Sequence, residues 1–293
     1  MTTERAYAKL NLSLDVLGKL PGGYHELCMV MESVDLCDEL EISLRRDGQV
    51  RLETAISWLP RDKRNLAVAA VYAFREALGD ETLGADIQLK KRIPVGAGMA
   101  GGSTDAACVL RLLNRAFGLP LSDKKLAETA LTLGADVPFC LWGGTALAGG
   151  VGEKLKPLSP MPDCLLVVGK PSFSVSTKAA FALYDEKPRP ACPPSTAVTA
   201  ALEQGDLKAL GAGMFNALEE PVAGQHPAIG QAVRLLEKDG ALGARMTGSG
   251  SAVFGIFDNE AAAQKAAQDL RRLCREVFVT RPLARRSPGK WEE

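Results

Sequence analysis

Residues 6–16 alternate between apolar and polar side chains. Every even position in this segment is Ala, Leu or Val, while the odd positions include Lys9 and Asn11. A period of two predicts a strand with one buried face. A Pro-Gly-Gly sequence at 21–23 then predicts a turn.

Patterns further along predict strands and helices in both halves of the chain. Strands are expected at 27–34, 38–46, 85–93, 143–152, 164–169 and 276–280, with two more around 248–250. Helices are expected at 65–78, 103–117, 122–134, 176–185, 197–212, 227–239 and 259–274, and a proline-rich loop at 188–195. These elements interleave without a regular βαβ rhythm, which predicts an α+β fold. Clustered prolines predict a domain boundary near 155–163.

A glycine-rich loop precedes the helix expected at 103–117. Residues 94–104 read Pro-Val-Gly-Ala-Gly-Met-Ala-Gly-Gly-Ser-Thr. Glycines let the backbone approach a ligand closely, and a helix N-terminus offers unpaired amide groups to an anion. The loop is therefore interpreted as a phosphate cradle. The alternative is an ordinary strand-to-helix turn with Ser103 or Thr104 as the capping residue.

Two better-known phosphate loops fit this segment poorly. Gly96, Gly98 and Gly101 satisfy the dinucleotide-binding spacing, but the preceding strand is charged where such a strand should be apolar on both faces. Gly96 and Gly101 also have the Walker A spacing, but Gly102 stands where that motif has its lysine. The cation that contacts the phosphates must therefore come from elsewhere in the chain.

Composition and charge narrow the class of protein. Lys plus Arg and Asp plus Glu both number 35, so the net charge gives no reason to expect nucleic acid or an anionic membrane as a partner. No apolar run reaches the roughly 20 residues that span a bilayer. The first residues lack the layout of a signal peptide, and the seven cysteines form no C-x-x-C pair. We therefore expect reduced thiols, including Cys192, and a cytoplasmic location.

Lys9 and Asp136 are candidates for chemistry. Lys9 lies on the polar side of the first predicted strand, where a lysine is usually only a solvated charge. Asp136 follows a predicted helix and is either a turn-former or a carboxylate facing a site. Phosphoryl transfer to an alcohol requires held phosphates, a divalent cation and a group that accepts the hydroxyl proton. The hypothesis is that Asp136 is this base and that Lys9 holds it ionised and oriented.

Two further segments have functional and structural interpretations. His25 follows Tyr24 after a double-glycine turn, and the pair could stack on and hydrogen-bond a base, although a lone histidine is usually structural. His226 is expected on the surface. Residues 247–251 read Thr-Gly-Ser-Gly-Ser, for which a tight hairpin is favoured over a second backbone-amide nest.

Five segments, in this order along the chain, resemble the GHMP kinases, and more specifically the branch that phosphorylates a cytidyl diphosphate sugar alcohol. The five segments are Ala8-Lys9-Leu10-Asn11-Leu12, Gly23-Tyr24-His25-Glu26-Leu27, the loop 94–107, Gly134-Ala135-Asp136-Val137-Pro138-Phe139 and Thr247-Gly248-Ser249-Gly250-Ser251. Each segment is weakly specific, but together they span nearly the whole chain.

The resemblance implies an enzyme that transfers the γ-phosphate of ATP, with Mg²⁺, to the 2-hydroxyl of 4-diphosphocytidyl-2-C-methyl-D-erythritol in the non-mevalonate isoprenoid pathway. Lys9 and Asp136 match the catalytic pair. Substrate contacts would be Asn11, Tyr24, His25 and Phe181, with the cytosine near Tyr24 and His25. The ATP phosphates would bind the loop formed by Pro94, Val95, Gly96, Ala97, Gly98, Met99, Ala100, Gly101, Gly102, Ser103 and Thr104.

The resemblance also implies a two-domain α+β fold. Residues 1–156 would form an N-terminal domain like ribosomal protein S5 domain 2, and residues 157–293 a ferredoxin-like sandwich, with the active site in the cleft between them. The protein would be a monomer or homodimer whose partners are small molecules.

The loop departs from the family pattern, which usually reads Gly-Leu-Gly-Gly-Gly-Ser-Ser. Ala100 adds a Cβ where the family has glycine, which matters for ATP affinity if the residue needs a positive φ. Two alternatives stay open: another GHMP kinase, such as a homoserine or mevalonate kinase, and a non-catalytic GHMP-fold regulator. The Tyr24-His25 turn argues against the first, and retention of both Lys9 and Asp136 argues against the second.

Overall fold

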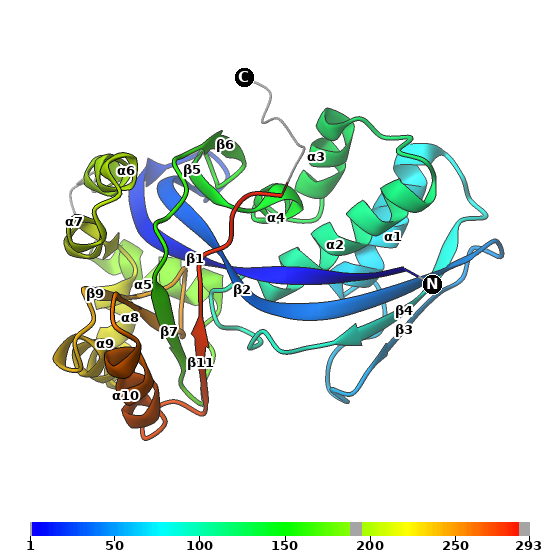
Figure 1. The fold of residues 1–293 in the computed structure, drawn as a ribbon. Coiled ribbons are helices and arrows are strands. Elements are labelled where there is room, and N and C mark those ends of the chain that lie inside the picture. The colour runs from blue at the N-terminus through cyan, green and yellow to red at the C-terminus, as the bar shows by residue number, and fades with distance from the viewer. Residues whose placement is uncertain (1, 188–194, 287–293) are drawn as a thin grey trace.

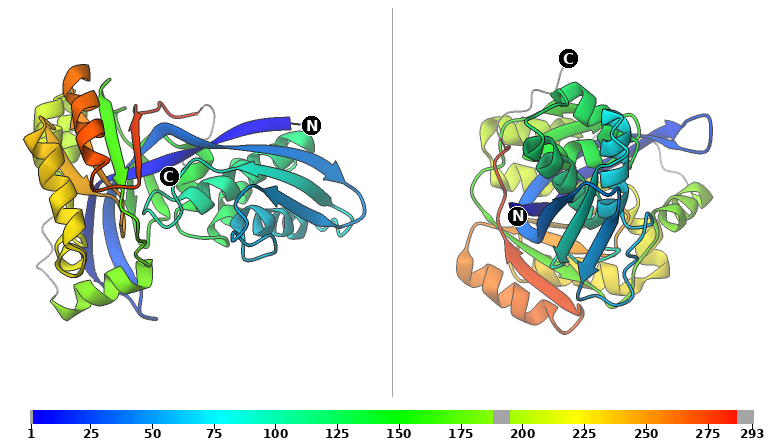
Figure 2. Two further views of the ribbon diagram at one scale, coloured as in Figure 1. Left: turned by 90° about the horizontal axis from the view of Figure 1, so that it is seen from below. Right: turned by 90° about the vertical axis from the view of Figure 1, so that its right-hand side faces the viewer.

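The structure, a computed structural model, describes residues 2–187 and 195–286. A long antiparallel hairpin of strands β1 and β2 runs through both halves of the molecule, as Figure 1 shows. Strands β1 and β2 belong to the larger of two sheets, and helices α1 and α2 form a layer on one side of that sheet (Figure 2). The predicted loop 188–195 and Cys192 fall largely or wholly outside the described residues.

The first sheet has seven strands. Its main path is β3-β4-β2-β1-β8, and β5 joins β6 to the edge of β2. These strands are β1 (Thr2–Lys19), β2 (His25–Arg45), β3 (Val50–Thr54), β4 (Gly84–Lys90), β5 (Thr145–Gly149), β6 (Lys154–Pro157) and β8 (Phe215–Asn216). The predicted boundary after residue 156 falls at the end of β6 and remains a prediction.

The second sheet has four strands in the order β11-β7-β10-β9, all antiparallel. They are β7 (Leu165–Lys170), β9 (Gly243–Met246), β10 (Val253–Phe257) and β11 (Glu276–Thr280). With one helical connection before β9 and another after β10, this is the order of a ferredoxin-like sandwich. The α+β class and the C-terminal architecture that the resemblance implied are thus confirmed.

The helices begin at the polar residues that the sequence marks. Asn65 accepts a hydrogen bond from the amide of Ala67, and Ser122 accepts one from Lys125, as N-caps do. The helices are α1 (Leu66–Leu78), α2 (Gly101–Ala116), α3 (Asp123–Leu131), α4 (Val137–Trp142), α5 (Thr177–Glu186), α6 (Ser195–Gln204), α7 (Leu207–Gly213), α8 (Glu219–Gln225), α9 (Pro227–Lys238) and α10 (Glu260–Leu270).

The prediction that β1 has one buried face is wrong, because both faces are buried. Its polar residues Lys9, Asn11 and Ser13 are at most 4% exposed. Segments from the second half of the chain cover them: Thr247 accepts a hydrogen bond from the amide of Asn11, and the hydroxyls of Ser13 and Ser195 lie 3.2 Å apart. The hairpin is therefore the shared core of the two halves.

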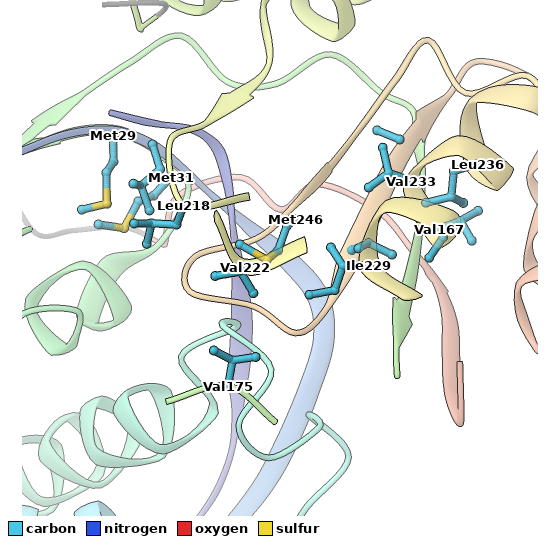
Figure 3. Close-up of a cluster of buried hydrophobic side chains, with 14 of the residues drawn as sticks. Met29, Met31, Val167, Val175, Leu218, Val222, Ile229, Val233, Leu236 and Met246 are labelled. Carbon is cyan, nitrogen blue, oxygen red and sulfur yellow. The ribbon is translucent and has the colours of Figure 1, made fainter. Parts of the chain in front are cut away.

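Hydrophobic packing also joins the two halves. Met29 and Met31 on β2 lie in one buried cluster with Leu218, Val222 and Met246 from the C-terminal half (Figure 3). Because side chains from both sheets fill this cluster, a shift of one half against the other would open cavities in it. The two halves are thus held in a fixed relation, which matters for any site built between them.

Other differences from the predictions are local. The strands expected at 27–34 and 38–46 form one continuous strand, and the helix expected at 197–212 is divided into α6 and α7. Helix α2 begins at Gly101, ahead of the expected start at 103 or 104. His226 is half-buried and stacks on Phe173, with ring centroids 4.6 Å apart. No helix in the described part of the chain is long and apolar enough to cross a membrane.

Candidate active site

A cavity of about 1260 Å³ lies where the two halves meet. Its walls come from β1, the turn after it, the loop before α2, the start of α4, helix α5 and the β9–β10 turn. The predicted site residues that line it are Lys9, Asn11, Tyr24, His25, Asp136, Phe181 and ten of the loop residues, Pro94 to Ser103. Residues from five separate segments are therefore brought to one place.

Thr104 is the one predicted site residue that does not line the cavity. Its side chain is 1% exposed, and its hydroxyl donates a 2.6 Å hydrogen bond to the carbonyl of Tyr7. Thr104 therefore ties the first turn of α2 to β1, two residues from Lys9.

The loop backbone has the shape of an anion cradle. Gly96, Gly98 and Ala100 have φ values of 65°, 73° and 56°, so every second residue is in the left-handed region. The first hydrogen bond of α2 runs from Thr104 to the Ala100 carbonyl, and the amides of residues 101–103 precede it. Such amides, with the helix dipole behind them, favour phosphate oxygens.

The loop is held in place by the β9–β10 turn and by β1. The amide of Ala252 donates to the Ala97 carbonyl at 3.3 Å, and the amide of Lys9 donates to the Met99 carbonyl at 3.2 Å. The turn itself is the tight hairpin favoured by the sequence: the Thr247 amide donates to the Ala252 carbonyl at 3.0 Å, and the Gly250 amide donates to the Thr247 carbonyl at 2.9 Å. Its Gly248 and Ser249 also line the cavity.

Lys9 and Asp136 meet in the cavity, although 127 positions separate them in the printed sequence. Lys9 Nζ lies 3.8 Å from Asp136 Oδ2 and donates a 2.6 Å hydrogen bond to Asn11 Oδ1. The Lys9 side chain is 5% exposed and that of Asp136 is 34% exposed. The lysine is thus buried and fixed, while the carboxylate remains open to a ligand.

The end of the cavity nearest the β1–β2 turn is aromatic. The rings of His25 and Phe181 stack with centroids 4.6 Å apart and planes at 16°, and Tyr24 is 66% exposed at the rim. His25 covers one face of Phe181, while Tyr24 leaves an exposed ring on which a planar base could stack.

Asp185, a charged partner of His25, and Lys19, which pairs with Asp185, carry no sequence signal that singles them out. Asp185 Oδ1 lies 2.8 Å from His25 Nε2, and Asp185 Oδ2 lies 2.9 Å from Lys19 Nζ. Burial opposes the charge of Asp185, but hydrogen bonds from Lys19 and His25 outweigh it and lower its pKa.

A buried ion triad under the phosphate loop was also not anticipated. Lys91 Nζ pairs with Asp38 and, at 2.8 Å, with Asp105 Oδ2, and all three side chains are at most 4% exposed. Burial raises the pKa of Asp105 well above its usual value, with Asp38 adding to the effect and Lys91 opposing it. Burial opposes the charge of Lys91, yet the two carboxylates outweigh it and raise its pKa. Lys91 Nζ also contacts the Gly101 carbonyl at 3.3 Å, so the triad supports the start of α2.

Arg111 on α2 holds the short helix that follows Asp136. It donates to the carbonyl groups of Cys140 and Leu141 at 2.7 and 3.1 Å, at the C-terminal end of α4. Its Nε also donates to Glu4 at 2.6 Å. Burial opposes the charge of Glu4, but Arg111 and its neighbouring arginines outweigh it and lower the pKa. This arginine therefore links β1, α2 and α4.

Comparison with known proteins gives a consistent family. The chain matches the models for the GHMP kinases N terminal domain over residues 65–144 and the GHMP kinases C terminal domain over residues 198–276. It is 42% identical over 276 residues to the 4-diphosphocytidyl-2-C-methyl-D-erythritol kinase of Caldicellulosiruptor saccharolyticus, covering 94% of this chain and 95% of that one. It is 39% identical over 289 residues to the protein of that name from Alkaliphilus metalliredigens, covering 99% and 98%.

Solved structures have the same arrangement. A crystal structure of 4-(cytidine 5'-diphospho)-2C-methyl-D-erythritol kinase superposes with a TM-score of 0.81 at 34% identity, over 96% of this chain and 99% of that one. A homoserine kinase from Cytophaga hutchinsonii superposes with a TM-score of 0.75 at 21% identity, over 97% and 96%, and so shares the fold.

Proposed function

The chain belongs to the 4-diphosphocytidyl-2-C-methyl-D-erythritol kinases of the GHMP superfamily, and we propose that it transfers the γ-phosphate of ATP to the 2-hydroxyl of that cytidyl substrate. The observation that carries the proposal is the single cavity shared by Lys9, Asp136, the phosphate loop and the aromatic pair His25–Phe181. An alcohol kinase without a nucleobase in its substrate has no use for the aromatic pair.

In the proposed reaction, Asp136 accepts the proton of the substrate hydroxyl while the alcohol oxygen attacks the γ-phosphorus and ADP leaves. The Lys9 ammonium, fixed by Asn11, orients the Asp136 carboxylate at 3.8 Å and balances negative charge at the reacting oxygen. The backbone amides at the start of α2 hold the ATP phosphates. Positioning and electrostatics supply most of the catalysis in such transfers.

Mg²⁺ fits this site as a companion of ATP. The described residues contain no group of three or more His, Cys, Asp or Glu side chains that could hold a metal ion by themselves. Magnesium bound with a nucleotide takes most ligands from phosphate and water and needs only one or two from the protein. Ser103, in the first turn of α2, is the residue that would hold it. The cation would neutralise charge on the transferred phosphoryl group.

We also propose a cytoplasmic location, where ATP is supplied and thiols stay reduced. The six cysteines within the described residues are all unpaired, which supports a reducing compartment.

The proposal is tested with a coupled ADP-release assay using Mg-ATP and three alcohols: 4-diphosphocytidyl-2-C-methyl-D-erythritol, mevalonate and homoserine. Turnover of the cytidyl substrate alone is expected. Asp136→Asn should lower kcat by about 10²–10⁴-fold, the usual range for a positioned base, while calorimetry shows unchanged ATP binding. Asp163→Asn is the matched control, because that side chain is 85% exposed and pairs with Arg281.

Other results would redirect the assignment. Turnover of another alcohol only would preserve the kinase and overturn the substrate. ATP binding without turnover of any alcohol would favour the regulatory protein. Near-normal turnover by Asp136→Asn would remove Asp136 from the mechanism.

A further inference from the structure

Asp185 connects the aromatic end of the cavity to two basic side chains. It lies in the last turn of α5, one turn after Phe181, and lines the cavity. One carboxylate oxygen is 2.8 Å from His25 Nε2 and the other is 2.9 Å from Lys19 Nζ. The reaction mechanism leaves this carboxylate without a role.

The contact with Asp185 determines which nitrogen of His25 carries the proton. A carboxylate can only accept hydrogen bonds, so Nε2 must be the donor. In the neutral ring the other nitrogen, Nδ1, then presents a lone pair. Among the described residues, Nδ1 makes no hydrogen bond of its own.

Lys19 gives Asp185 a second partner, a cation, besides His25. Its ammonium already balances the carboxylate charge at 2.9 Å, so the pair is neutral without a charged imidazole. A charged imidazole would instead present a donor at Nδ1. In a neutral ring, the contact with Asp185 therefore places the donor of His25 toward that carboxylate and an acceptor at the opposite edge.

Packing fixes the orientation of that edge. The His25 ring is 7% exposed, stacks on Phe181 at 4.6 Å and meets the edge of Tyr184 at 6.3 Å and 88°. A half-turn of the ring would keep the stack but would remove Nε2 from Asp185, so the hydrogen bond selects one of the two orientations.

We propose that Asp185 is a positioning residue that sets base specificity, by holding His25 as an acceptor for the 4-amino group of cytosine. Cytosine carries an amino donor at this position, whereas uracil carries an oxygen acceptor that would face the Nδ1 lone pair. This inference rests on the proposed function for the identity of the base. A hydrogen-bond mismatch of this kind should give about 10–100-fold discrimination between the two bases.

Asp185→Asn tests the proposal, because the amide keeps the shape but can donate to Nε2 and release the ring to the other tautomer. For the cytidyl substrate, the variant should have a KM raised about tenfold with kcat unchanged. The preference for the cytidyl over the uridyl substrate should fall toward one. Asp163→Asn should change neither quantity. An unchanged preference in Asp185→Asn would overturn the proposal.

A second readout reports the tautomer itself. The chain has two histidines, so nitrogen NMR of protein labelled at histidine gives His25 and His226, which a His226→Gln variant distinguishes. The wild type should show a protonated Nε2 and an unprotonated Nδ1, and Asp185→Asn should shift that balance. A ring protonated at Nδ1 in the wild type would refute the proposal.

Binding separates this inference from the reaction. Calorimetry with CMP and UMP, in the presence of a saturating non-hydrolysable ATP analogue, measures the base preference without turnover. Tighter binding of CMP, lost in Asp185→Asn, would support the role of Asp185 even if the proposed reaction failed. Equal binding of CMP and UMP by the wild type would overturn that role even if the reaction were confirmed.

Discussion

Ala100 sits in the phosphate loop with a backbone conformation that suits glycine. Its φ and ψ are 56° and 28°, in the left-handed region. There the Cβ of an L-residue crowds the following carbonyl at a cost of about 1–2 kcal/mol. The residue nevertheless precedes α2 directly, and Thr104 donates the first helical hydrogen bond to its carbonyl. We expect Ala100→Gly to stabilise the folded protein by relieving this strain.

The expected gain is the difference between two opposing effects. Glycine removes about 1–2 kcal/mol of strain but adds about 0.4–1 kcal/mol of unfolded-chain entropy. The net increase in the free energy of unfolding is therefore about 0.5–1 kcal/mol, or a rise in Tm of about 1–3 °C for a chain of this length. Urea denaturation measures the free energy, and the ADP-release assay should show unchanged kcat.

Two further variants serve as controls. Leu119 has a φ of 63° and is 64% exposed after the end of α2, so Leu119→Gly should give a similar gain away from the cavity. Ala97 lies in the same loop and is not among the residues with positive φ, so Ala97→Gly should destabilise by about 0.5–1 kcal/mol. If Ala100→Gly lowers the free energy of unfolding as Ala97→Gly does, the backbone strain at Ala100 does not reduce the stability of the protein and the prediction is refuted.

Two more perturbations concern buried charge. Lys91→Met should lower the free energy of unfolding, measured by urea denaturation, by about 3–5 kcal/mol, because it leaves Asp38 and Asp105 buried without their cation. The control is Lys90→Met at an exposed lysine, and a similar loss of stability in the two variants would contradict the prediction. Glu32 is buried and accepts a 2.6 Å hydrogen bond from Thr145. Burial raises its pKa from 4.5 to about 8, so the folded state holds the proton more tightly than the unfolded chain. Its stabilisation is complete below about pH 4.5 and is lost as the pH rises through 8. Stability of the wild type relative to Glu32→Gln should therefore fall over this range, and parallel pH profiles of the two proteins would refute the assignment.

The sequence predicted most elements because their signals are local. The caps at Asn65 and Ser122 and the turn at 21–23 depend on neighbouring residues, and all three are present. Burial of the polar face of β1 could not be predicted, since it depends on Thr247 and Ser195 from far along the chain. The short elements β8 and α4 have too few residues for a periodic pattern.

Some residues of the candidate site could likewise be predicted from the sequence, and others could not. Lys9, Asp136 and the loop could be identified because each lies in a short contiguous motif that is recognisable in the sequence. Lys91 and Asp38 were not, because 53 positions separate them and neither lies in a distinctive pattern. The same holds for Asp185 and its partner His25, 160 positions away. The proposed ligand-contacting residues thus lie in recognisable motifs, whereas Lys91, Asp38 and Asp185 were found only from their contacts in the structure.

The glycine-rich loop shows why motif and packing must be considered together. A Cβ at Gly98 would lie 2.1 Å from the Thr247 carbonyl oxygen, and one at Gly248 would lie 2.9 Å from the Gly98 carbonyl oxygen. These two glycines are therefore required for the loop and the β9–β10 turn to touch, whatever ligand binds there. Gly101 and Gly102, whose amides precede the first helical hydrogen bond of α2, are placed to meet a phosphate. One glycine-rich segment thus closes the two halves around the cavity and, in the proposed function, also presents amides to the ATP phosphates.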